Sequence, residues 1–201
     1  MTRQGLHREN KRMSRVAVVT GGSRGIGAEI ARQLKDAGYK VAATYHGNVE
    51  AAEAFSKESG ISVYKWDVAD FEECKAAVAQ IEADLGPVDI LVNNAGILRD
   101  KSFKNLDLGD WDIVMDVHLN GSAYVTKAAW PIMYEKQYGR IVFTSSTSGI
   151  FGNFGQANYG AAKMGMLGIM NVLAIEGVSK NIRVNCLAPF AETRLIGTIP
   201  G

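Results

Sequence analysis

The segment that most constrains the fold of this chain is a glycine-rich turn between a predicted strand and a predicted helix. Residues 15–20 (RVAVVT) form a short β-branched run, and residues 26–37 carry a helical pattern that stops at Gly38. Between them lies the run from Thr20 to Gly27 (TGGSRGIG). Glycines permit a tight turn and a close approach of the backbone to a pyrophosphate, and the following helix N-terminus offers free N–H groups. The turn therefore predicts a dinucleotide-binding unit, although an ordinary glycine-rich turn shares the pattern.

Predicted strands and helices alternate along the chain. The strands are expected at 15–20, 40–44, 62–65, 89–93, 139–145 and 182–188. The helices are expected at 26–37, 48–58, 70–85, 110–136 and 156–179, and Pro131 can bend the fourth of them. This alternation predicts βαβ units with right-handed crossovers. We expect an α/β fold with a doubly wound parallel sheet in three layers (Rossmann-type αβα), as one domain over residues 15–201, preceded by a disordered basic tail at residues 1–14.

Charge and cysteine content exclude several classes of protein. The 201 residues carry a formal net charge of +1, which does not fit a strongly basic nucleic-acid-binding protein. Cys74 and Cys186 lie far apart and form no Cys-x-x-Cys motif, so neither a disulfide scaffold nor a metal site is expected, and a reducing cytoplasm is predicted. The longest apolar run, 164–175, is interrupted by Asn171 and falls short of a bilayer span of about 20 residues, so no membrane segment is predicted.

The end of the second predicted strand bears on which nucleotide the turn binds. An acidic residue there binds the ribose 2′-hydroxyl of NAD and repels the 2′-phosphate of NADP. This chain has Thr44, Tyr45 and His46 at that point, and no carboxylate. Arg24 can pair with a 2′-phosphate through its planar donors, so NADP is expected over NAD, unless Arg24 is a solvated surface arginine. The residues of the turn that are expected to contact the cofactor are Gly21, Ser23, Arg24, Gly25, Ile26 and Gly27.

A second set of residues follows the fifth predicted strand. Ser146 lies just beyond the strand, Tyr159 follows thirteen residues later, and Lys163 follows four residues after that. Tyr159 and Lys163 share one face of a helix. The carboxyl edge of a doubly wound sheet is where such folds bind their ligands. Because a Tyr-x-x-x-Lys pair is common by chance, the prediction of a catalytic site rests on its combination with Ser146 and the glycine-rich turn.

These three side chains can move a proton to or from a carbonyl oxygen. A free tyrosine has a pKa of about 10, which is too high for a base at neutral pH. The Lys163 ammonium and the positive nicotinamide of an oxidised cofactor are expected to lower that pKa. Tyr159 then exchanges a proton with the substrate oxygen, and Ser146 donates a hydrogen bond to it where charge develops. The predicted reaction interconverts a ketone and a secondary alcohol, with Lys163 also holding the nicotinamide ribose.

Together these residues resemble the short-chain dehydrogenase/reductase family. The resemblance covers residues 16–194 and rests on the run 20–27, on Asn93-Asn94-Ala95-Gly96, on Ser146 and on Tyr159-Gly160-Ala161-Ala162-Lys163. It implies that residues 93–96 stabilise the central sheet and that Asp67 meets the adenine ring. The cofactor contacts that it implies beyond the glycine-rich turn are Tyr45, Asp67, Val68, Asn94, Ala95, Gly96, Tyr159, Lys163, Pro189 and Thr193.

Two branches of the family are visible in the sequence. Residues 16–96, including Tyr64-Lys65-Trp66-Asp67-Val68, resemble bacterial acetoacetyl-CoA reductases, which use NADPH. Residues 95–194, especially the run 149–159 (GIFGNFGQANY), resemble the (3R)-hydroxyacyl-CoA dehydrogenase part of peroxisomal multifunctional enzyme type 2. Both imply a 3-oxoacyl or (R)-3-hydroxyacyl thioester as substrate, and acetoacetyl-CoA is the substrate expected before others of this class. The alternatives are an NAD-dependent (3R)-hydroxyacyl-CoA dehydrogenase, a 3-oxoacyl carrier-protein reductase, and a truncated relative that binds a dinucleotide without turnover.

The chain departs from the family pattern at His118, which stands where most members carry a catalytic asparagine. The second of the two branches is similar in carrying histidine there. The resemblance implies that His118 supports the water joining Lys163 to solvent, and the alternative is a core histidine with satisfied hydrogen bonds. Asn120 is out of register for the role.

The C-terminal end of the chain departs from the pattern as well. Phe190 replaces the glycine that the family carries after Pro189, and Thr193 is still expected to contact the cofactor. The chain ends at Gly201, where the family continues to a seventh strand. Part of the substrate lid, the last strand and one subunit interface are therefore expected to be missing.

Apolar residues in the second half of the chain point to a partner and to a substrate pocket. The predicted helix from Gln156 is almost uncharged over 164–175, and a helix that is apolar all round is buried on both sides. One side is expected to pack on the sheet and the other, with the helix 110–136, to meet a second copy in a dimer or tetramer, the alternative being burial within the monomer. Ile150 and Phe154 are expected to line an acyl pocket, with Leu98, Met133 and Phe151 as further candidates, unless these residues belong to the core.

Overall fold

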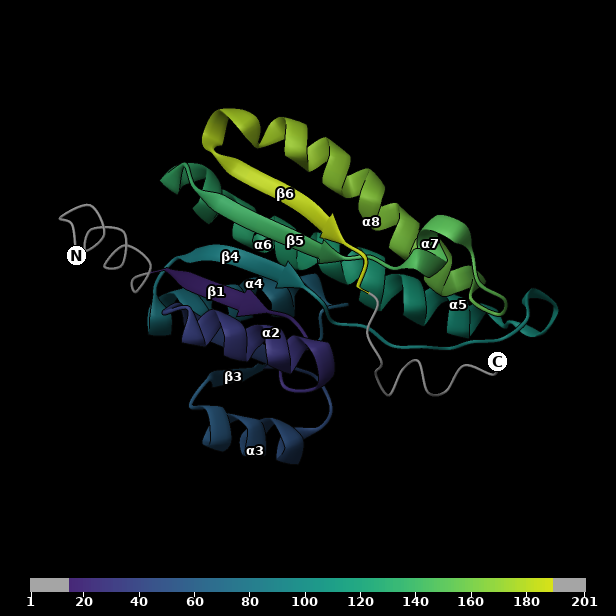
Figure 1. Cartoon of the computed structure of the whole chain (residues 1–201), viewed down its shortest axis with the longest axis horizontal. Coiled ribbons are helices and arrows are strands. Elements are labelled where there is room, and N and C mark those ends of the chain that lie inside the picture. The colour runs from purple at the N-terminus through teal and green to yellow at the C-terminus, as the bar shows by residue number, and fades with distance from the viewer. Residues whose placement is uncertain (1–14, 190–201) are drawn as a thin grey trace.

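The computed structural model describes residues 15–189, so the predicted basic tail, Phe190 and Thr193 lie outside the described residues. Its centre is a six-stranded parallel sheet with the strand order β3-β2-β1-β4-β5-β6 (Figure 1). The strands are β1 (Val16–Val19), β2 (Lys40–Tyr45), β3 (Ser62–Lys65), β4 (Val88–Asn93), β5 (Gly139–Thr144) and β6 (Ile182–Leu187). The order reverses between β1 and β4, and a doubly wound sheet binds its ligand in the crevice at such a point. The predicted fold class is confirmed.

Helices connect successive strands and cover both faces of the sheet. They are α2 (Gly25–Asp36), α3 (Val49–Ser59), α4 (Phe71–Leu85), α5 (Leu108–Met115), α6 (Gly121–Lys136), α7 (Thr147–Phe151) and α8 (Ala157–Glu176). Short 3₁₀ turns lie at Phe103–Asn105 and Val178–Lys180. Two of these helices begin with a side-chain cap, because the Asn48 side chain accepts from the Ala51 N–H and the Asp70 side chain accepts from the Glu73 N–H.

Two apolar cores hold the layers together, one on each face of the sheet. Val16 and Val18 of β1 belong to the larger core, whereas Ala17 and Val19 belong to the smaller one, as the alternation along a strand requires. Helices α4, α6 and α8 pack into the larger core, and α2 and α3 into the smaller. Because β1 is buried on both faces, its sequence is apolar throughout rather than alternating.

Two local features depart from the predicted elements. The single helix expected at 110–136 is formed by α5 and α6 joined through a π-helical turn, η2 (Asp116–Asn120), and Pro131 lies inside α6. The turn η2 carries His118, and π-helical turns inside helices occur frequently at functional sites. The five-residue helix α7 was not predicted, because one helical turn is too short to show a period.

Within residues 15–189, no helix combines the length and the apolar character that crossing a membrane requires. Cys74 and Cys186 are free thiols in the same range. No group of three or more potential metal-binding side chains of the His, Cys, Asp and Glu types occurs in this described part of the chain.

Candidate active site

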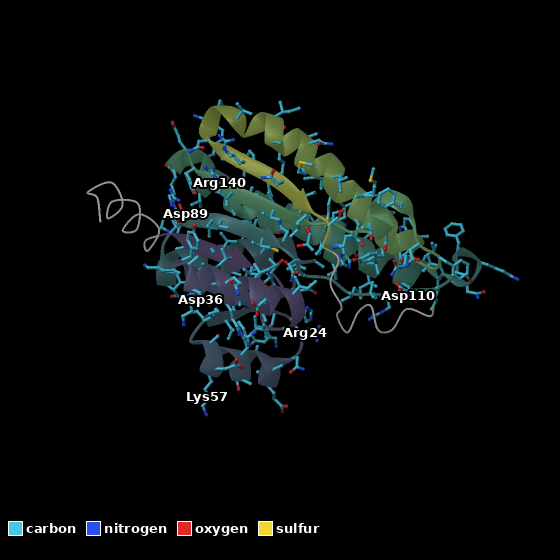
Figure 2. The ribbon with its side chains drawn as sticks, viewed as in Figure 1. Arg24, Asp36, Lys57, Asp89, Asp110 and Arg140 are labelled. Atoms are coloured by element: carbon cyan, nitrogen blue, oxygen red, sulfur yellow. The ribbon has the colours of Figure 1, made fainter. Side chains whose placement is uncertain are left out.

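A cleft of about 1340 Å³ opens along the carboxyl edge of the sheet. Figure 2 shows Arg24 and Asp110 at this edge, with Asp89 and Arg140 at the opposite end of the strands. The cleft brings together the turn after β1, the ends of β2 to β5 and the first turns of α8. The predicted site residues that line it are Gly21, Ser23, Arg24, Gly25, Ile26, Gly27, Tyr45, Asp67, Val68, Asn94, Ala95, Gly96, His118, Ser146, Tyr159, Lys163 and Pro189.

The turn between β1 and α2 can form only with glycine at certain positions. Gly21 and Gly25 have φ angles of +62° and +55°, in the left-handed region that favours glycine. A Cβ at Gly27 would lie 2.3 Å from the Gly21 carbonyl oxygen and 2.5 Å from Asn94 Nδ2. The turn is therefore closed tightly against the segment after β4, and the backbone N–H groups at the start of α2 face the cleft without a side-chain cap.

Hydrogen bonds fix the ends of β1 and β4 to each other. The Thr20 hydroxyl accepts from the backbone N–H groups of Asn94 at 2.9 Å and Ala95 at 3.0 Å. The Asn94 side chain returns a bond from Nδ2 to the Thr20 carbonyl oxygen at 3.0 Å. Asn93 donates to the Thr126 hydroxyl at 2.9 Å, which attaches the end of β4 to α6. This arrangement matches the stabilising role that the family resemblance implies for residues 93–96.

The end of β2 presents a different environment from the one expected from the sequence. Tyr45 and His46 line the cleft without a carboxylate of their own strand. However, Asp67, which follows β3, reaches the same place, where its Oδ2 lies 3.5 Å from His46 Nδ1. Arg24 is exposed, and its guanidinium makes no hydrogen bond or ion pair with another described residue. Arg24 is thus free to pair with an anion at the mouth of the cleft.

Ser146, Tyr159 and Lys163 meet at the other end of the cleft, as predicted. Ser146 is the N-cap of α7, where its Oγ accepts from the Ser148 N–H at 3.2 Å. Tyr159 and Lys163 lie on successive turns of α8, with the Lys163 ammonium 5.4 Å from the centroid of the tyrosine ring. Lys163 is only 3% exposed, and its Nζ donates to the Thr144 carbonyl oxygen at 2.5 Å. The end of β5 and the helix α8 therefore position all three side chains.

Burial changes the acidity of both helical residues. It lowers the pKa of Lys163 to about 7. It also raises the pKa of Tyr159; the Ser146 hydroxyl acts in the opposite direction, and the charge of Asp100 raises the value further. Among the chain's own residues, desolvation of the phenolate outweighs the interactions that would lower this pKa, and the lowering expected from an oxidised nicotinamide stays a prediction. A protonated phenol at neutral pH is suited to giving a proton to a carbonyl oxygen.

His118 is a buried, uncharged residue between two parts of the site. Its Nε2 lies 3.0 Å from the Ile97 nitrogen and 2.7 Å from the Ile97 oxygen, so one of these two hydrogen bonds forms in each tautomer. Its Nδ1 is buried without a hydrogen-bond partner among the described residues. Burial, followed by the charge of Lys163, lowers the pKa of His118 to about 3. The ring is therefore bonded to the backbone as a core histidine is, and its link to a water beside Lys163 stays a prediction.

The two predicted acyl-pocket residues do not line the cleft. Phe154 is 86% exposed and Ile150 is 45% exposed, and neither contributes to the cleft wall. In the one-turn helix α7, Phe151 faces the cleft instead, on the same side as Thr147 and Ser148. Leu98 also lines the cleft, whereas Met133 is fully buried in the larger core. Of the five candidates for the acyl pocket, Leu98 and Phe151 therefore line the cleft, and Ile150, Phe154 and Met133 do not.

Polar residues just before Tyr159 form contacts that the sequence did not indicate. Gln156 is 3% exposed and donates to Asp100 Oδ2 at 2.8 Å. Asn158 is fully buried and donates to the carbonyl oxygens of Arg99 and Asp110. These bonds join residues more than forty positions apart, so no local pattern in the sequence could have identified them.

Comparison with known proteins gives one family. The family profile described as short chain dehydrogenase matches residues 15–195. An acetoacetyl-CoA reductase of Shinella zoogloeoides is 51% identical over 189 residues, which cover 94% of this chain and 78% of that protein. An acetoacetyl-CoA reductase of Rhizobium meliloti is 52% identical with the same coverage. The peroxisomal multifunctional enzyme type 2 of Drosophila melanogaster is 44% identical over 92% of this chain and 33% of that protein.

Proposed function

Because the chain belongs to the short-chain dehydrogenase family, as an oxidoreductase that acts on CH–OH groups, we propose that it reduces 3-oxoacyl thioesters with NADPH to the (R)-3-hydroxy products, with acetoacetyl-CoA as the first substrate. The observation that carries the proposal is the convergence of Ser146, Tyr159 and Lys163 on a cleft that also contains the glycine-rich turn. The named relatives above support the choice of thioester.

The residues present fit a dinucleotide. The uncapped N-terminus of α2 offers backbone N–H groups to a pyrophosphate, and Gly27 leaves no side chain in the way. Arg24 lines the same cleft, and its guanidinium makes no ion pair with another residue of the range 15–189, which suits a 2′-phosphate. When bound, NADPH supplies the hydride for the reduction.

The chain's own residues supply a proton and stabilise charge on the substrate oxygen. Tyr159 carries its proton at neutral pH and gives it to that oxygen as the alcohol forms. Ser146 has one lone pair occupied by the Ser148 N–H, so its hydroxyl hydrogen is free to bond the same oxygen. The Thr144 carbonyl oxygen accepts a hydrogen bond from Lys163 Nζ and so holds this amine beside the phenol. Burial lowers the pKa of Lys163 to about 7, so the amine is protonated in part of the molecules at neutral pH.

NADPH is proposed over NADH because Arg24 lies at the mouth of the cleft and the end of β2 has no carboxylate. Asp67 approaches the same region, but it lies 3.5 Å from the imidazole of His46. Arg24 makes no ion pair with Asp67 or with any other described residue, so its guanidinium stays available to a phosphate. The site therefore favours the ribose 2′-phosphate of NADPH over the free 2′-hydroxyl of NADH.

A second candidate is the reverse reaction, oxidation of a (3R)-hydroxyacyl-CoA with NAD. Its support is the 44% identity to the peroxisomal multifunctional enzyme type 2. In this direction Tyr159 would accept the proton of the hydroxyl group, so the same three residues serve both reactions, and the nucleotide and substrate preferences distinguish the two candidates.

The test is to follow NADPH consumption with acetoacetyl-CoA, beside NADH with the same substrate and NAD with (R)-3-hydroxybutyryl-CoA. The proposal predicts the highest kcat/KM for NADPH with acetoacetyl-CoA. Binding of NADPH without consumption on any 3-oxoacyl thioester would overturn it in favour of a dinucleotide-binding relative without turnover. A preference for NAD and the hydroxyacyl substrate would establish the second candidate.

The outer side of α8 supports assembly into a homo-oligomer. Met164, Val172 and Ile175 are 51%, 54% and 77% exposed, and with Gly168 they form one stripe along the helix. An exposed apolar stripe of this length is typical of a subunit interface. We therefore propose a dimer or tetramer through α8, with the neighbouring helix α5–α6. Light scattering should find a mass above that of the 21.7 kDa chain and a monomer for Val172→Glu; a monomeric parent protein would contradict the assembly.

A further inference from the structure

Asn158, the residue before Tyr159, is fully buried although it is polar. Its side chain forms three hydrogen bonds: Nδ2 donates to the carbonyl oxygens of Arg99 at 3.2 Å and Asp110 at 3.1 Å, and Oδ1 accepts from the Tyr159 N–H at 2.8 Å. Two donors and one acceptor are used, so the amide is nearly saturated. Buried polar groups that are satisfied in this way fix the arrangement of the segments they join.

The bond to the Tyr159 N–H replaces a missing helix cap. The first N–H groups of a helix have no partner inside it, and the N-cap residue of α8, Gln156, makes no side-chain capping bond. Asn158 instead pairs its own Oδ1 with the N–H of Tyr159. The backbone of the residue that carries the phenol is therefore held by the side chain next to it.

The two bonds from Nδ2 reach parts of the cleft that are distant in sequence. The Arg99 carbonyl oxygen belongs to the segment 97–101 after β4, and the Asp110 carbonyl oxygen belongs to the first turn of α5. Within the segment 97–101, Leu98 and Arg99 line the cleft. Asn158 thus joins α8, this wall and α5 at a single point.

Two further bonds run beside it along the same seam. The Lys101 N–H donates to the Gly155 carbonyl oxygen at 2.9 Å, and Gln156 donates to Asp100 at 2.8 Å. These two bonds attach the segment 97–101 to the residues leading into α8. Of these seam residues, Asn158 is the one that bonds to the backbone of Tyr159, whereas His118, which is bonded to Ile97, contacts the tyrosine through its ring.

We propose that Asn158 is a positioning residue that holds the phenol of Tyr159 at a fixed separation from the cleft wall at residues 97–101. The substrate carbonyl that rests on this wall then meets Tyr159 and Ser146 together. This inference rests on the proposed function in that Tyr159 is the proton donor. Its effect on the reaction is through geometry, since misplacement of a reacting group by about 1 Å costs about 10²-fold in rate.

The test compares Asn158→Ala and Asn158→Ser with Asn185→Ala, which changes an exposed asparagine on β6. Alanine removes all three bonds, whereas serine can keep one acceptor and one donor. We expect kcat to fall about 10²-fold in Asn158→Ala and less in Asn158→Ser, with the Kd for NADPH unchanged. Asn185→Ala should retain the parent kcat. If Asn158→Ala does not fold, Asn158→Ser carries the comparison.

A second readout needs no substrate. The ultraviolet titration of Tyr159, taken as the difference from Tyr159→Phe, reports how buried the phenol is. Because burial raises the pKa of Tyr159, loss of Asn158 should lower that pKa toward its ordinary value. A parent-like kcat together with a parent-like Tyr159 titration in the Asn158 variants would overturn the inference. Failure of the proposed function shows separately, as a parent protein that reduces no 3-oxoacyl thioester.

Discussion

The imidazole of His118 stands edge-on to the phenol ring of Tyr159, with ring centroids 5.2 Å apart and ring planes at 89°. The imidazole also occupies the space in front of Gly96, where a Cβ would lie 2.2 Å from His118 Cε1. The imidazole therefore packs against both Gly96 and the phenol. The position of each ring depends on the absence of a side chain at residue 96.

From this packing we predict that Gly96→Ala lowers both the free energy of unfolding and kcat, because the new methyl group displaces His118 and with it Tyr159. His118→Ala removes the clash, so the double variant should be more stable than the sum of the single effects by about 1 kcal/mol or more. Urea unfolding of the four proteins measures this coupling. If the changes in the free energy of unfolding caused by the two substitutions were strictly additive, residues 96 and 118 would not be energetically coupled.

Lys163→Met is predicted to stabilise the fold while it removes activity. Burial lowers the pKa of Lys163 from 10.5 to about 7, so the folded state binds fewer protons than the unfolded state between these values. The cost of burying the charge is therefore present in full below pH 7 and disappears as the pH rises through 10.5. Methionine keeps the packing and removes this cost, although it also loses the bond to the Thr144 carbonyl oxygen.

The urea midpoint of Lys163→Met should accordingly exceed that of the parent protein at pH 7, and the gain should shrink as the pH approaches 10.5. Lys57→Met, on the exposed side of α3, is the matched control and should show no such trend (Figure 2). A gain that does not change with pH, or a loss of stability at pH 7, would contradict the assignment of a buried charge.

Arg24→Ala is predicted to weaken NADPH binding selectively. A hydrogen bond to a charged group contributes about 1.5–3 kcal/mol, so the Kd for NADPH should rise about 10-fold or more while the Kd for NADH changes little. Nucleotide fluorescence titration measures both constants. Arg32→Ala is the control, since Arg32 lies on α2, which directly follows Arg24, but pairs with Glu58 at 3.1 Å and does not line the cleft. An equal effect on the two nucleotides would remove Arg24 from the selection of the phosphate.

The arrangement of strands and the dinucleotide turn could be predicted because both leave local patterns. The apolar run at β1 and the glycines from Gly21 to Gly27 are consecutive in sequence, and the spacing of Tyr159 and Lys163 follows from a single helix. Their meeting with Ser146 follows from the rule that parallel strands place their carboxyl ends at one edge.

Features that depend on distant contacts could not be predicted. Whether Ile150 or Phe151 faces the cleft depends on how one helical turn is docked, and α7 is too short to have a period. The buried amide of Asn158 looks like any polar residue until Arg99 and Asp110 are placed beside it. The burial that raises the pKa of Tyr159 was equally invisible in the sequence, since desolvation depends on the whole surrounding structure.

Single-turnover oxidation of NADPH by acetoacetyl-CoA in Tyr159→Phe tests most directly whether the phenol is the proton donor of this cleft. The ring and its packing remain, and only the hydroxyl is lost. The predicted result is a rate lower by about 10²–10⁴-fold with an unchanged Kd for NADPH. Tyr134→Phe, which changes a 47% exposed tyrosine on α6, should keep the parent rate. A Tyr159→Phe protein that transfers hydride at the parent rate would contradict the assignment of Tyr159.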